Sequence, residues 1–193
     1  MDAAFFSHLE KIQFLPLISC EQVVAERVAA FFLSHGIDTV EIPLRSDFAV
    51  STIRFLKDRF PDLTLLAGTV LTSHQAVEAS DAGASAIVSP GWNEDVYRVS
   101  SERCLPYIPG VFTATEVQNA FAHGCRYLKF FPAAAVGVGY LNALASPFFS
   151  YGIRFMPTGG INHQNYRSFL ELPSVFCVAG SDFESVFYRD DSE

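Results

Sequence analysis

TATEVQNAFAHGCRYLKFFP, the stretch from Thr113 to Pro132, joins a predicted helix to a predicted buried strand. Thr113 followed three residues later by Glu116 is the pattern of a capped helix start, and Gly124 stands where such a helix would end. The apolar run over residues 127–131 has the length of a buried strand. The stretch therefore predicts one helix followed by one strand.

The same alternation of strand and helix runs through the rest of the chain. Helices are predicted at residues 21–35 and 73–81, and strands at residues 14–19, 39–43, 64–67, 86–89, 107–108, 127–131, 153–156 and 175–179. Strands that alternate with helices pair in parallel through right-handed crossovers. About eight strands at a spacing of roughly 20–25 residues predict an α/β fold of the (β/α)8 TIM-barrel type. No GxGxxG follows the first strand to favour a dinucleotide-binding sheet.

The two ends of the chain depart from a full barrel. A short helix is expected before the first strand. After the last strand only residues 181–193 remain, so the eighth helix is predicted to be missing or shortened. The last strand would then need cover from a neighbouring subunit or from residues 3–12.

Composition restricts the class of protein. With 193 residues, of which 50% are hydrophobic and 18% charged, the chain is predicted to form a single domain over residues 1–193. A formal net charge of -8 and no basic stripe argue against a nucleic-acid partner. No apolar stretch reaches the roughly 18 to 20 residues of a membrane span, and the N-terminus lacks a signal-peptide pattern, so no membrane partner is expected.

The cysteines give no sign of a metal or redox site. The chain has four, none of them in a CxxC pair: Cys20, Cys104, Cys125 and Cys177. Reduced thiols and a cytoplasmic location are the simplest interpretation. Neither a metal nor a cofactor is expected.

Lys129 stands within the apolar run over residues 127–131. An apolar environment disfavours the ammonium form of a lysine, and a neutral amine is a nucleophile. Schiff-base formation with a carbonyl substrate is the best attested use of such an amine. The alternative is a lysine at a strand end that extends to solvent.

Polar and small residues follow several predicted strands, at the barrel end where active sites form. They are Glu41, Arg45, Gly68, Thr69, Ser89, Pro90, Thr113, Lys129, Thr158, Gly159, Gly160, Gly180 and Ser181. A carboxylate, a lysine, an arginine and two small-residue loops suit a reaction on an anionic carbonyl compound.

Two members of this set have simpler alternatives. Glu41 could form an ion pair with Arg45 instead of moving protons. Gly159 and Gly160 could form a plain turn, or they could let an anion approach backbone N–H groups. A short helix starting near Asn162 would add its dipole to such an anion site.

Six motifs in order resemble the 2-keto-3-deoxy-6-phosphogluconate (KDPG) aldolases and their 4-hydroxy-2-oxoglutarate (KHG) and phosphogalactonate relatives, which are class I aldolases of the (β/α)8 type. The similarity runs from about residue 15 to residue 181. The motifs are Val40-Glu41-Ile42-Pro43-Leu44-Arg45, Ala67-Gly68-Thr69-Val70-Leu71, Ser89-Pro90-Gly91, Ile108-Pro109-Gly110, Lys129-Phe130-Phe131-Pro132-Ala133 and Pro157-Thr158-Gly159-Gly160-Ile161.

The resemblance implies a role for each matching residue. Lys129 would be the Schiff-base lysine, and Glu41 the carboxylate that shuttles protons through a water molecule. The other roles are substrate binding by Arg45, Thr69, Pro90, Phe131 and Thr158, and phosphate binding by Gly159, Gly160, Gly180 and Ser181. The resemblance also implies a small keto-acid substrate and a homotrimer.

One departure from the family concerns the substrate. Phosphogluconate-specific members usually have a glutamate soon after the segment that matches Lys129 to Pro132, where this chain has Ala133-Ala134-Ala135. KDPG is the expected substrate, with KHG or the phosphogalactonate analogue as alternatives. Two other functions stay open at this point: an isomerase or decarboxylase that uses Lys129 as an electrostatic clamp, and a non-catalytic keto-acid sensor.

Overall fold

The computed structural model describes residues 2–182, and the chain divides into two compact units. One unit contains residues 17–108, and the other contains residues 1–16 together with residues 109–193. The prediction of a missing or shortened eighth helix falls mainly on residues 183–193, which lie outside the described residues. The single domain over residues 1–193 stays a prediction. Within residues 2–182, no helix combines the length and the apolar character needed to cross a bilayer.

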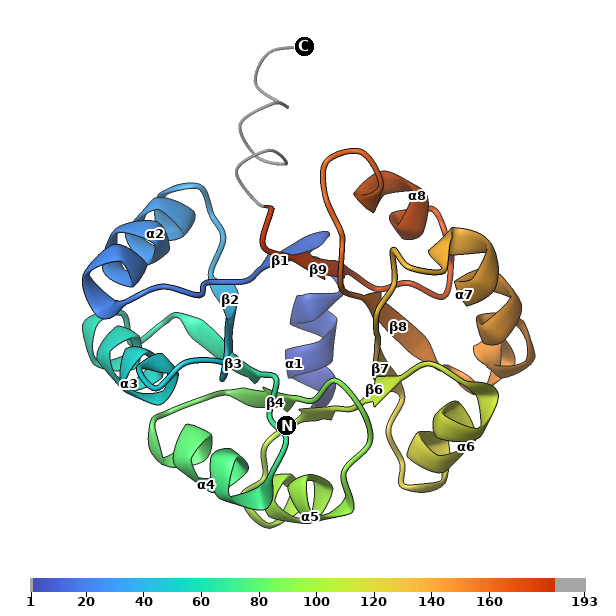
Figure 1. Cartoon of the computed structure of the whole chain (residues 1–193), viewed down its shortest axis with the longest axis horizontal. Helices are drawn as coiled ribbons and strands as arrows, with labels where there is room; N and C mark the ends of the chain where they lie inside the picture. Colours follow the sequence, from blue (N-terminus) through green and yellow to red (C-terminus); the bar gives the residue numbers. More distant parts are fainter. Residues whose placement is uncertain (1, 183–193) are drawn as a thin grey trace. The chain divides into compact units, whose positions relative to one another are not determined.

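Four parallel strands form the sheet of the unit at residues 17–108. They are β2 (Thr39–Pro43), β3 (Thr64–Gly68), β4 (Ala86–Val88) and β5 (Tyr107–Ile108), adjacent in that order. The helices α2 (Gln22–Ser34), α3 (Ala49–Arg59), α4 (Ser73–Asp81) and α5 (Glu94–Glu102) lie along one side of these strands (Figure 1). Side chains of Thr72 and Asn93 accept backbone N–H groups at the starts of α4 and α5.

The other unit has the same layered construction. Its strands β6 (Gly110–Val111), β7 (Tyr127–Phe130) and β8 (Arg154–Pro157) pair in parallel, and β9 (Val178–Gly180) pairs in parallel with β1 (Phe14–Pro16). Single bridges join Phe155 to Val175 and Thr158 to Ala179. The remaining elements are α6 (Ala114–Ala122), α7 (Gly137–Ala145), the 3-10 helix η1 (Ser146–Tyr151), α8 (Tyr166–Leu170) and α1 (Asp2–Leu9).

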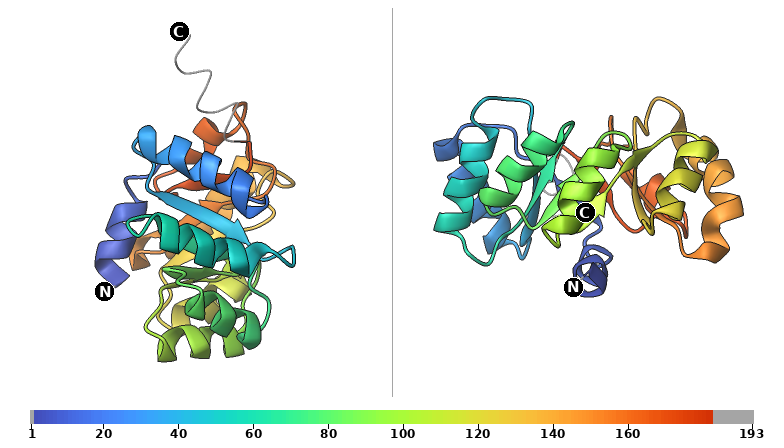
Figure 2. Two further views of the ribbon diagram at one scale, coloured as in Figure 1. Left: turned by 90° about the vertical axis from the view of Figure 1, so that its left-hand side faces the viewer. Right: turned by 90° about the horizontal axis from the view of Figure 1, so that it is seen from below.

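The short N-terminal helix α1 is confirmed (Figure 2). It contacts the first residue of β7, because Phe6 stacks on Tyr127 with ring centroids 3.9 Å apart. The Tyr127 hydroxyl also donates a hydrogen bond to Oε1 of Glu10 at 2.8 Å. The N-terminal segment therefore packs at the amino end of β7, and the short helix α8 contacts β9.

The capped start of α6 is confirmed in detail. Oε2 of Glu116 accepts from the backbone N–H groups of Phe112 and Thr113, at 2.8 and 2.7 Å, and from the Thr113 hydroxyl at 2.9 Å. Burial alone would raise the pKa of Glu116, but these three hydrogen bonds outweigh it and hold the pKa below its usual value. The carboxylate fixes the loop between β6 and α6.

The structure adds one strand to the predicted elements and moves the start of one helix. The strand predicted at residues 107–108 is confirmed as β5, but the unpredicted strand β6 follows it after Pro109, which has no N–H to continue a ladder. The helix expected near Asn162 is wrong, because α8 begins only at Tyr166. Side-chain oxygens of Asn162 and Asn165 accept the N–H groups of Gln164 and Asn162, and such local hydrogen bonds compete with helix formation.

Candidate active site

Lys129 lies inside β7, and its side chain is only 1% exposed. Its backbone pairs with Gly110 of β6 and Met156 of β8, and its N–H donates to the carbonyl of Pro109 at 2.9 Å. The alternative of a lysine that extends to solvent is therefore wrong. The amine nitrogen lies 5.7 Å from the ring centroid of Phe131, near the carboxyl end of the strand.

Thr158 follows β8 directly and is held against the strand of the lysine. Its N–H donates to the carbonyl of Phe130 at 2.9 Å, and its own carbonyl accepts from the N–H of Ala133 at 2.8 Å. The Thr158 side chain is buried, and its hydroxyl donates to the carbonyl of Met156 at 3.2 Å. The structure thus brings Thr158 to the end of the strand that carries Lys129, as predicted.

Gly159 and Gly160 form a left-handed turn against the segment that follows Lys129. Their φ angles are +94° and +73°, a region that favours glycine. A Cβ at Gly159 would come 2.9 Å from the ring of Phe131, and one at Gly160 would come 2.6 Å from Cβ of Ala134. Both glycines are therefore required by conformation and by close packing.

Asn165 was missed by the sequence analysis, although it supports this turn. Its side-chain amide donates to the carbonyl of Gly160 at 2.8 Å, while its Oδ1 accepts from the N–H of Asn162. An asparagine just before a helix start was the available signal. It was obscured because the helix was expected to begin near Asn162.

Gly180 ends β9, and Ser181 follows it as an exposed residue. A Cβ at Gly180 would lie 3.0 Å from the carbonyl oxygen of Ile161 and 3.2 Å from the ring of Phe14. The chain after β8 therefore packs closely on the end of β9. Within this unit, Lys129, Phe131, Thr158, both turn glycines and Gly180 all belong to the carboxyl ends of neighbouring strands.

Glu41 lies in β2 of the other unit and is fully buried, at 0% exposed. Its carboxylate fills the space next to Gly68 at the end of β3, where a Cβ would lie 2.5 Å from Cδ of Glu41. In the parallel register Gly68 is opposite Pro43, two residues after Glu41. The glycine is what allows a buried carboxylate to lie over the end of the neighbouring strand.

Arg45 and Thr69 meet at the ends of β2 and β3. Nε of Arg45 donates to the Thr69 hydroxyl at 3.2 Å. Thr69 has φ +56°, an uncommon conformation for a β-branched residue. Such strain often occurs where a side chain is held for binding.

Pro90 follows β4 in a loop that is tied to the loop after β3. The hydroxyl of the buried Ser89 donates to the carbonyl of Val70 at 2.7 Å. The Asn93 side chain donates to the carbonyl of Leu71 at 3.1 Å. These bonds place Pro90 beside the residues that follow Thr69.

Each unit therefore presents different chemistry at the carboxyl ends of its strands. One has a buried carboxylate and an exposed guanidinium hydrogen-bonded to a hydroxyl, and the other has a buried amine and a glycine turn. In the part of the chain that the structure describes, no group of three or more His, Cys, Asp or Glu could hold a metal ion. The residue types suit carbonyl chemistry on an anion.

Comparison with known proteins gives consistent results. A family model described as the KDPG and KHG aldolase matches residues 6–191. The 2-dehydro-3-deoxy-phosphogluconate aldolase of Dickeya dadantii is 42% identical over 155 residues, which cover 80% of this chain and 72% of that protein. The crystal structure of the KDPG aldolase of Legionella pneumophila, described with pyruvate captured as a covalent carbinolamine, has a TM-score of 0.87 and 33% identity over 96% of this chain and 91% of that one.

A second similar structure is a cube-shaped protein cage designed by fusing symmetric oligomeric domains. It has a TM-score of 0.79 and 28% identity, over 89% of this chain and 64% of that one. The likeness to aldolase structures over nearly the whole chain confirms the predicted (β/α)8 fold class.

Proposed function

This chain belongs to the KDPG and KHG aldolase family. We propose that it cleaves KDPG to pyruvate and glyceraldehyde 3-phosphate. The observation that carries the proposal is the amine of Lys129, which is almost fully buried in β7. Lysine side chains are rarely buried, and a buried amine is suited to act as a nucleophile. The covalent carbinolamine of the Legionella relative supports the same chemistry here.

Lys129 is the nucleophile. Its neutral amine adds to the C2 ketone to give a carbinolamine, which loses water to give a protonated imine. The imine accepts the electron pair of the C3–C4 bond when that bond breaks, which leaves an enamine on Lys129 and releases the aldehyde. Protonation of the enamine at C3 and hydrolysis then release pyruvate and regenerate the amine.

Glu41 is the general base and acid. It takes the proton of the C4 hydroxyl, through a water molecule, as the C3–C4 bond breaks, and it returns a proton to C3 of the enamine. Its burial beside Gly68 supports this role, because a buried carboxylate held in one position can transfer protons repeatedly to the same atoms.

Arg45 and Thr69 bind the carboxylate and keto end of the substrate. A guanidinium fork suits a carboxylate, and its hydrogen bond to Thr69 orients it. Pro90, Phe131 and Thr158 line the space around the reacting carbons. The 5.7 Å separation between the Lys129 amine and the Phe131 ring supports the assignment of Phe131.

Backbone N–H groups of Gly159, Gly160, Gly180 and Ser181 bind the phosphate of KDPG. The left-handed turn at the first two glycines supports this, since glycine lets an anion approach the backbone. The five-residue α8 begins too late to contribute a dipole at this turn. KHG is the second candidate substrate, favoured by Ala133-Ala134-Ala135 where phosphogluconate-specific members usually have a glutamate.

The enzyme is a cytoplasmic homotrimer that acts on a small keto acid and uses no metal or cofactor. The similarity to a domain used in a cage of symmetric oligomeric domains supports self-assembly. The four cysteines are free thiols, which suits the reducing cytoplasm.

Borohydride trapping with pyruvate tests the proposal. The chain has only three lysines, Lys11, Lys57 and Lys129, so peptide mapping assigns the reduced adduct without ambiguity. We expect one pyruvate-derived adduct, on Lys129, together with pyruvate release from KDPG in a coupled assay. An electrostatic clamp or a non-catalytic sensor predicts no adduct, and an adduct on Lys11 or Lys57 alone would contradict the proposed nucleophile.

A further inference from the structure

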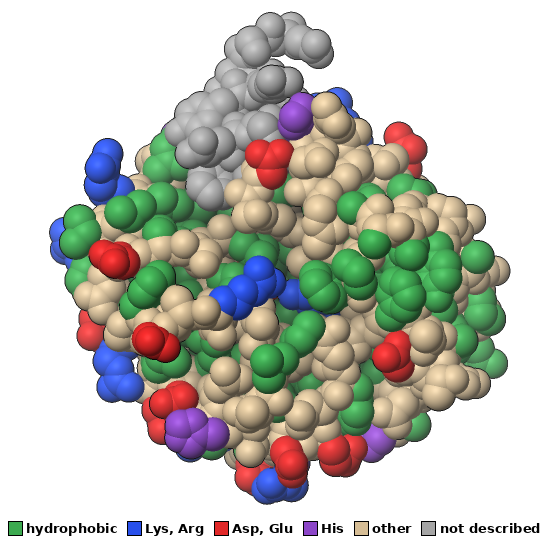
Figure 3. All heavy atoms as spheres, viewed as in Figure 1, with side chains coloured by type: hydrophobic (Ala, Val, Ile, Leu, Met, Phe, Trp, Pro, Cys, Tyr) green, Lys and Arg blue, Asp and Glu red, His purple; other side chains and the backbone are tan. Residues whose placement is uncertain are grey.

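A pocket of ≈ 250 Å³ lies between the helices α7 and η1 and the segment that precedes β9. None of the residues that line it carries a charge, and they are Asn142, Ala145, Ser146, Phe149, Pro173 and Ser174. The whole segment from Phe130 to Ile153 contains no Asp, Glu, Lys, Arg or His. On the face drawn in Figure 3, apolar side chains gather over α7 and charged ones are scattered elsewhere. The pocket is therefore an uncharged space in a chain with a net charge of -8.

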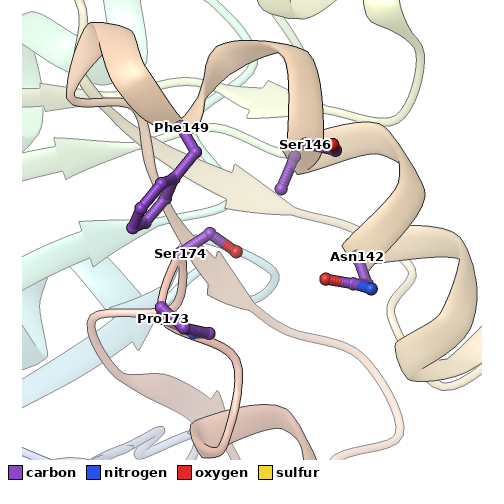
Figure 4. Close-up of a pocket in the computed structure, with 6 residues that line it drawn as sticks. Asn142, Ser146, Phe149, Pro173 and Ser174 are labelled. Atoms are coloured by element: carbon purple, nitrogen blue, oxygen red, sulfur yellow. The ribbon is translucent and has the colours of Figure 1, made fainter.

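Ser174 contributes a hydroxyl to this pocket that the fold does not use. The residue is only 5% exposed, and its carbonyl accepts from the N–H of Phe155 at 2.8 Å, which fixes it beside β8. Within residues 2–182 its hydroxyl has no hydrogen-bond partner. Figure 4 shows this hydroxyl pointing into the pocket, toward the side of Asn142. Since buried polar groups in proteins are hydrogen-bonded, the partner of Ser174 must come from whatever enters the pocket.

The other walls of the pocket combine an aromatic ring with further uncharged polar groups. Asn142 and Ser146 are four residues apart on consecutive helices, and Phe149 places its ring beside them. The guanidinium of Arg154 lies 4.9 Å from the centroid of that ring and so holds it in place. Arg154 itself lines a different pocket of ≈ 290 Å³, together with Glu10, so these two charges belong to another space.

This lining discriminates between classes of ligand. An ion would lose part of its hydration in the pocket without meeting a counter-ion. A wholly apolar ligand would displace the water that hydrates the Ser174 hydroxyl and leave that group unpaired. A neutral ligand with several hydroxyl groups replaces the hydrogen bonds of that water, and its C–H groups cover the Phe149 ring. A sugar in its ring form has both features.

We propose that this pocket is a binding site for one ring of a neutral sugar. Pockets for drug-sized ligands have volumes of about 300–1,000 Å³, so a space of ≈ 250 Å³ suits a single sugar ring. The site is separate from the proposed active site. Ser174 precedes β9 and lies beside the amino end of β8, whereas the Lys129 amine lies near the carboxyl end of β7. Binding here does not require that the protein cleaves KDPG.

The test titrates the protein with methyl α-D-glucopyranoside and follows binding by saturation-transfer NMR. This glucoside has no free carbonyl, so it cannot form an imine with Lys129. The matching methyl glucuronide differs from it by one carboxylate and probes the preference for a neutral ligand. Ser174→Ala removes the buried hydroxyl, and Asn142→Leu removes the amide but keeps a good helix former in α7. Ser51→Ala is the matched control, because the Ser51 hydroxyl lies on α3 and already donates to a backbone carbonyl.

Thermal unfolding and borohydride trapping of pyruvate are measured for every variant. They show that a variant is folded independently of its binding to the glucoside. Loss of aldolase turnover would change neither the titration nor its interpretation.

We expect the wild type and Ser51→Ala to bind the glucoside with a Kd of about 0.1–10 mM. Ser174→Ala and Asn142→Leu should each weaken binding about tenfold, and the wild type should bind the glucuronide at least about tenfold more weakly than the glucoside. No saturation transfer to the glucoside at about 50 mM would contradict the site. Unchanged binding in the two folded pocket variants would place the sugar elsewhere, and displacement of the glucoside by pyruvate would place it in the active site. Equal affinity for the glucuronide would contradict the preference for a neutral ligand.

Discussion

The carboxylate of Glu41 occupies the space that a side chain at position 68 would need, and residue 68 is a glycine. A Cβ at Gly68 would lie 2.5 Å from Cδ and 2.6 Å from Cγ of Glu41, well inside van der Waals contact. The two residues belong to adjacent parallel strands, so neither can move away without disturbing the sheet. The position of the proposed base is therefore set by the absence of a side chain on its neighbour.

Gly68→Ala should displace the Glu41 carboxylate. A shift of about 1 Å in a catalytic group can cost about 100-fold in rate, and overpacking a buried site costs about 1–3 kcal/mol of unfolding free energy. We expect kcat to fall by about that factor while the protein still folds. Gly139→Ala is the control, since a Cβ there meets nothing within 4 Å. Wild-type kcat in Gly68→Ala would show that the carboxylate does not need this position.

Lys129→Ala should abolish turnover and leave the fold intact. The substitution removes the nucleophile and a buried amine, and loss of covalent catalysis costs on the order of 10³-fold or more in kcat. Steady-state kinetics and circular dichroism measure the two effects. Lys57→Ala, which removes an amine that donates to the backbone carbonyls of Pro61 and Leu63, should keep its activity. More than about a tenth of the wild-type rate in Lys129→Ala would exclude the Schiff-base mechanism.

Glu41→Gln keeps the shape of the side chain and removes the proton acceptor. Proton transfer should slow by roughly 10² to 10⁴-fold, while borohydride still traps pyruvate on Lys129, although slowly. Exchange of the pyruvate methyl protons with deuterated solvent, followed by NMR, isolates the step at C3. Exchange at the wild-type rate would assign the base to another group.

Thr69→Gly separates backbone strain from binding. A left-handed conformation costs a non-glycine residue about 1–2 kcal/mol, whereas glycine costs about 0.5–1 kcal/mol in lost entropy. Stability should therefore stay equal or rise slightly, but KM for the keto acid should increase about tenfold as the hydroxyl that holds Arg45 is lost. Cys104→Gly is matched, because Cys104 has φ +54°. Cys104→Gly should change the free energy of unfolding by about the same amount as Thr69→Gly and leave KM unchanged. If KM is also unchanged in Thr69→Gly, Thr69 does not belong to the binding site.

Gly160→Ala tests the phosphate site. The added Cβ would meet Ala134 at 2.6 Å, so the turn must shift, and kcat/KM for KDPG should fall more than kcat/KM for KHG. Gly124→Ala is the control, with φ +87° and open space around the added Cβ. The wild type should prefer KDPG by more than about tenfold, or roughly 1.4 kcal/mol, and inorganic phosphate should compete with it. If Gly160→Ala lowers kcat/KM equally for KDPG and KHG, and inorganic phosphate does not compete with KDPG, the turn binds no phosphate.

Much of the fold followed from local patterns. The limits of β2, β5 and α4 were predicted correctly, because the apolar runs of the two strands and the threonine cap of the helix depend only on residues close together in the sequence. The start of α8 was wrong, since it depends on which amide side chains accept backbone N–H groups. Periodicity carries no information about that competition.

The candidate site also contains features that neighbouring residues predict and features that they do not. Lys129 could be found from its apolar neighbours, and its burial agrees with that expectation. The support of Gly160 by Asn165 and the strain at Thr69 could not be found, because both arise from contacts or backbone angles that no sequence motif specifies. The requirement for glycine at position 68 likewise becomes visible only when the strand register is known.

The cap of α6 makes folding a proton-releasing process in mildly acidic solution. The Glu116 pKa is lower in the folded chain than in the unfolded one. At a pH between these two pKa values the unfolded chain therefore binds more protons. The stabilisation by this carboxylate is complete above its ordinary pKa and is lost as the pH falls through the lowered value. Acid would therefore loosen the loop between β6 and α6, next to the strand that carries Lys129, and the Glu116→Gln variant would lose this part of the acid response.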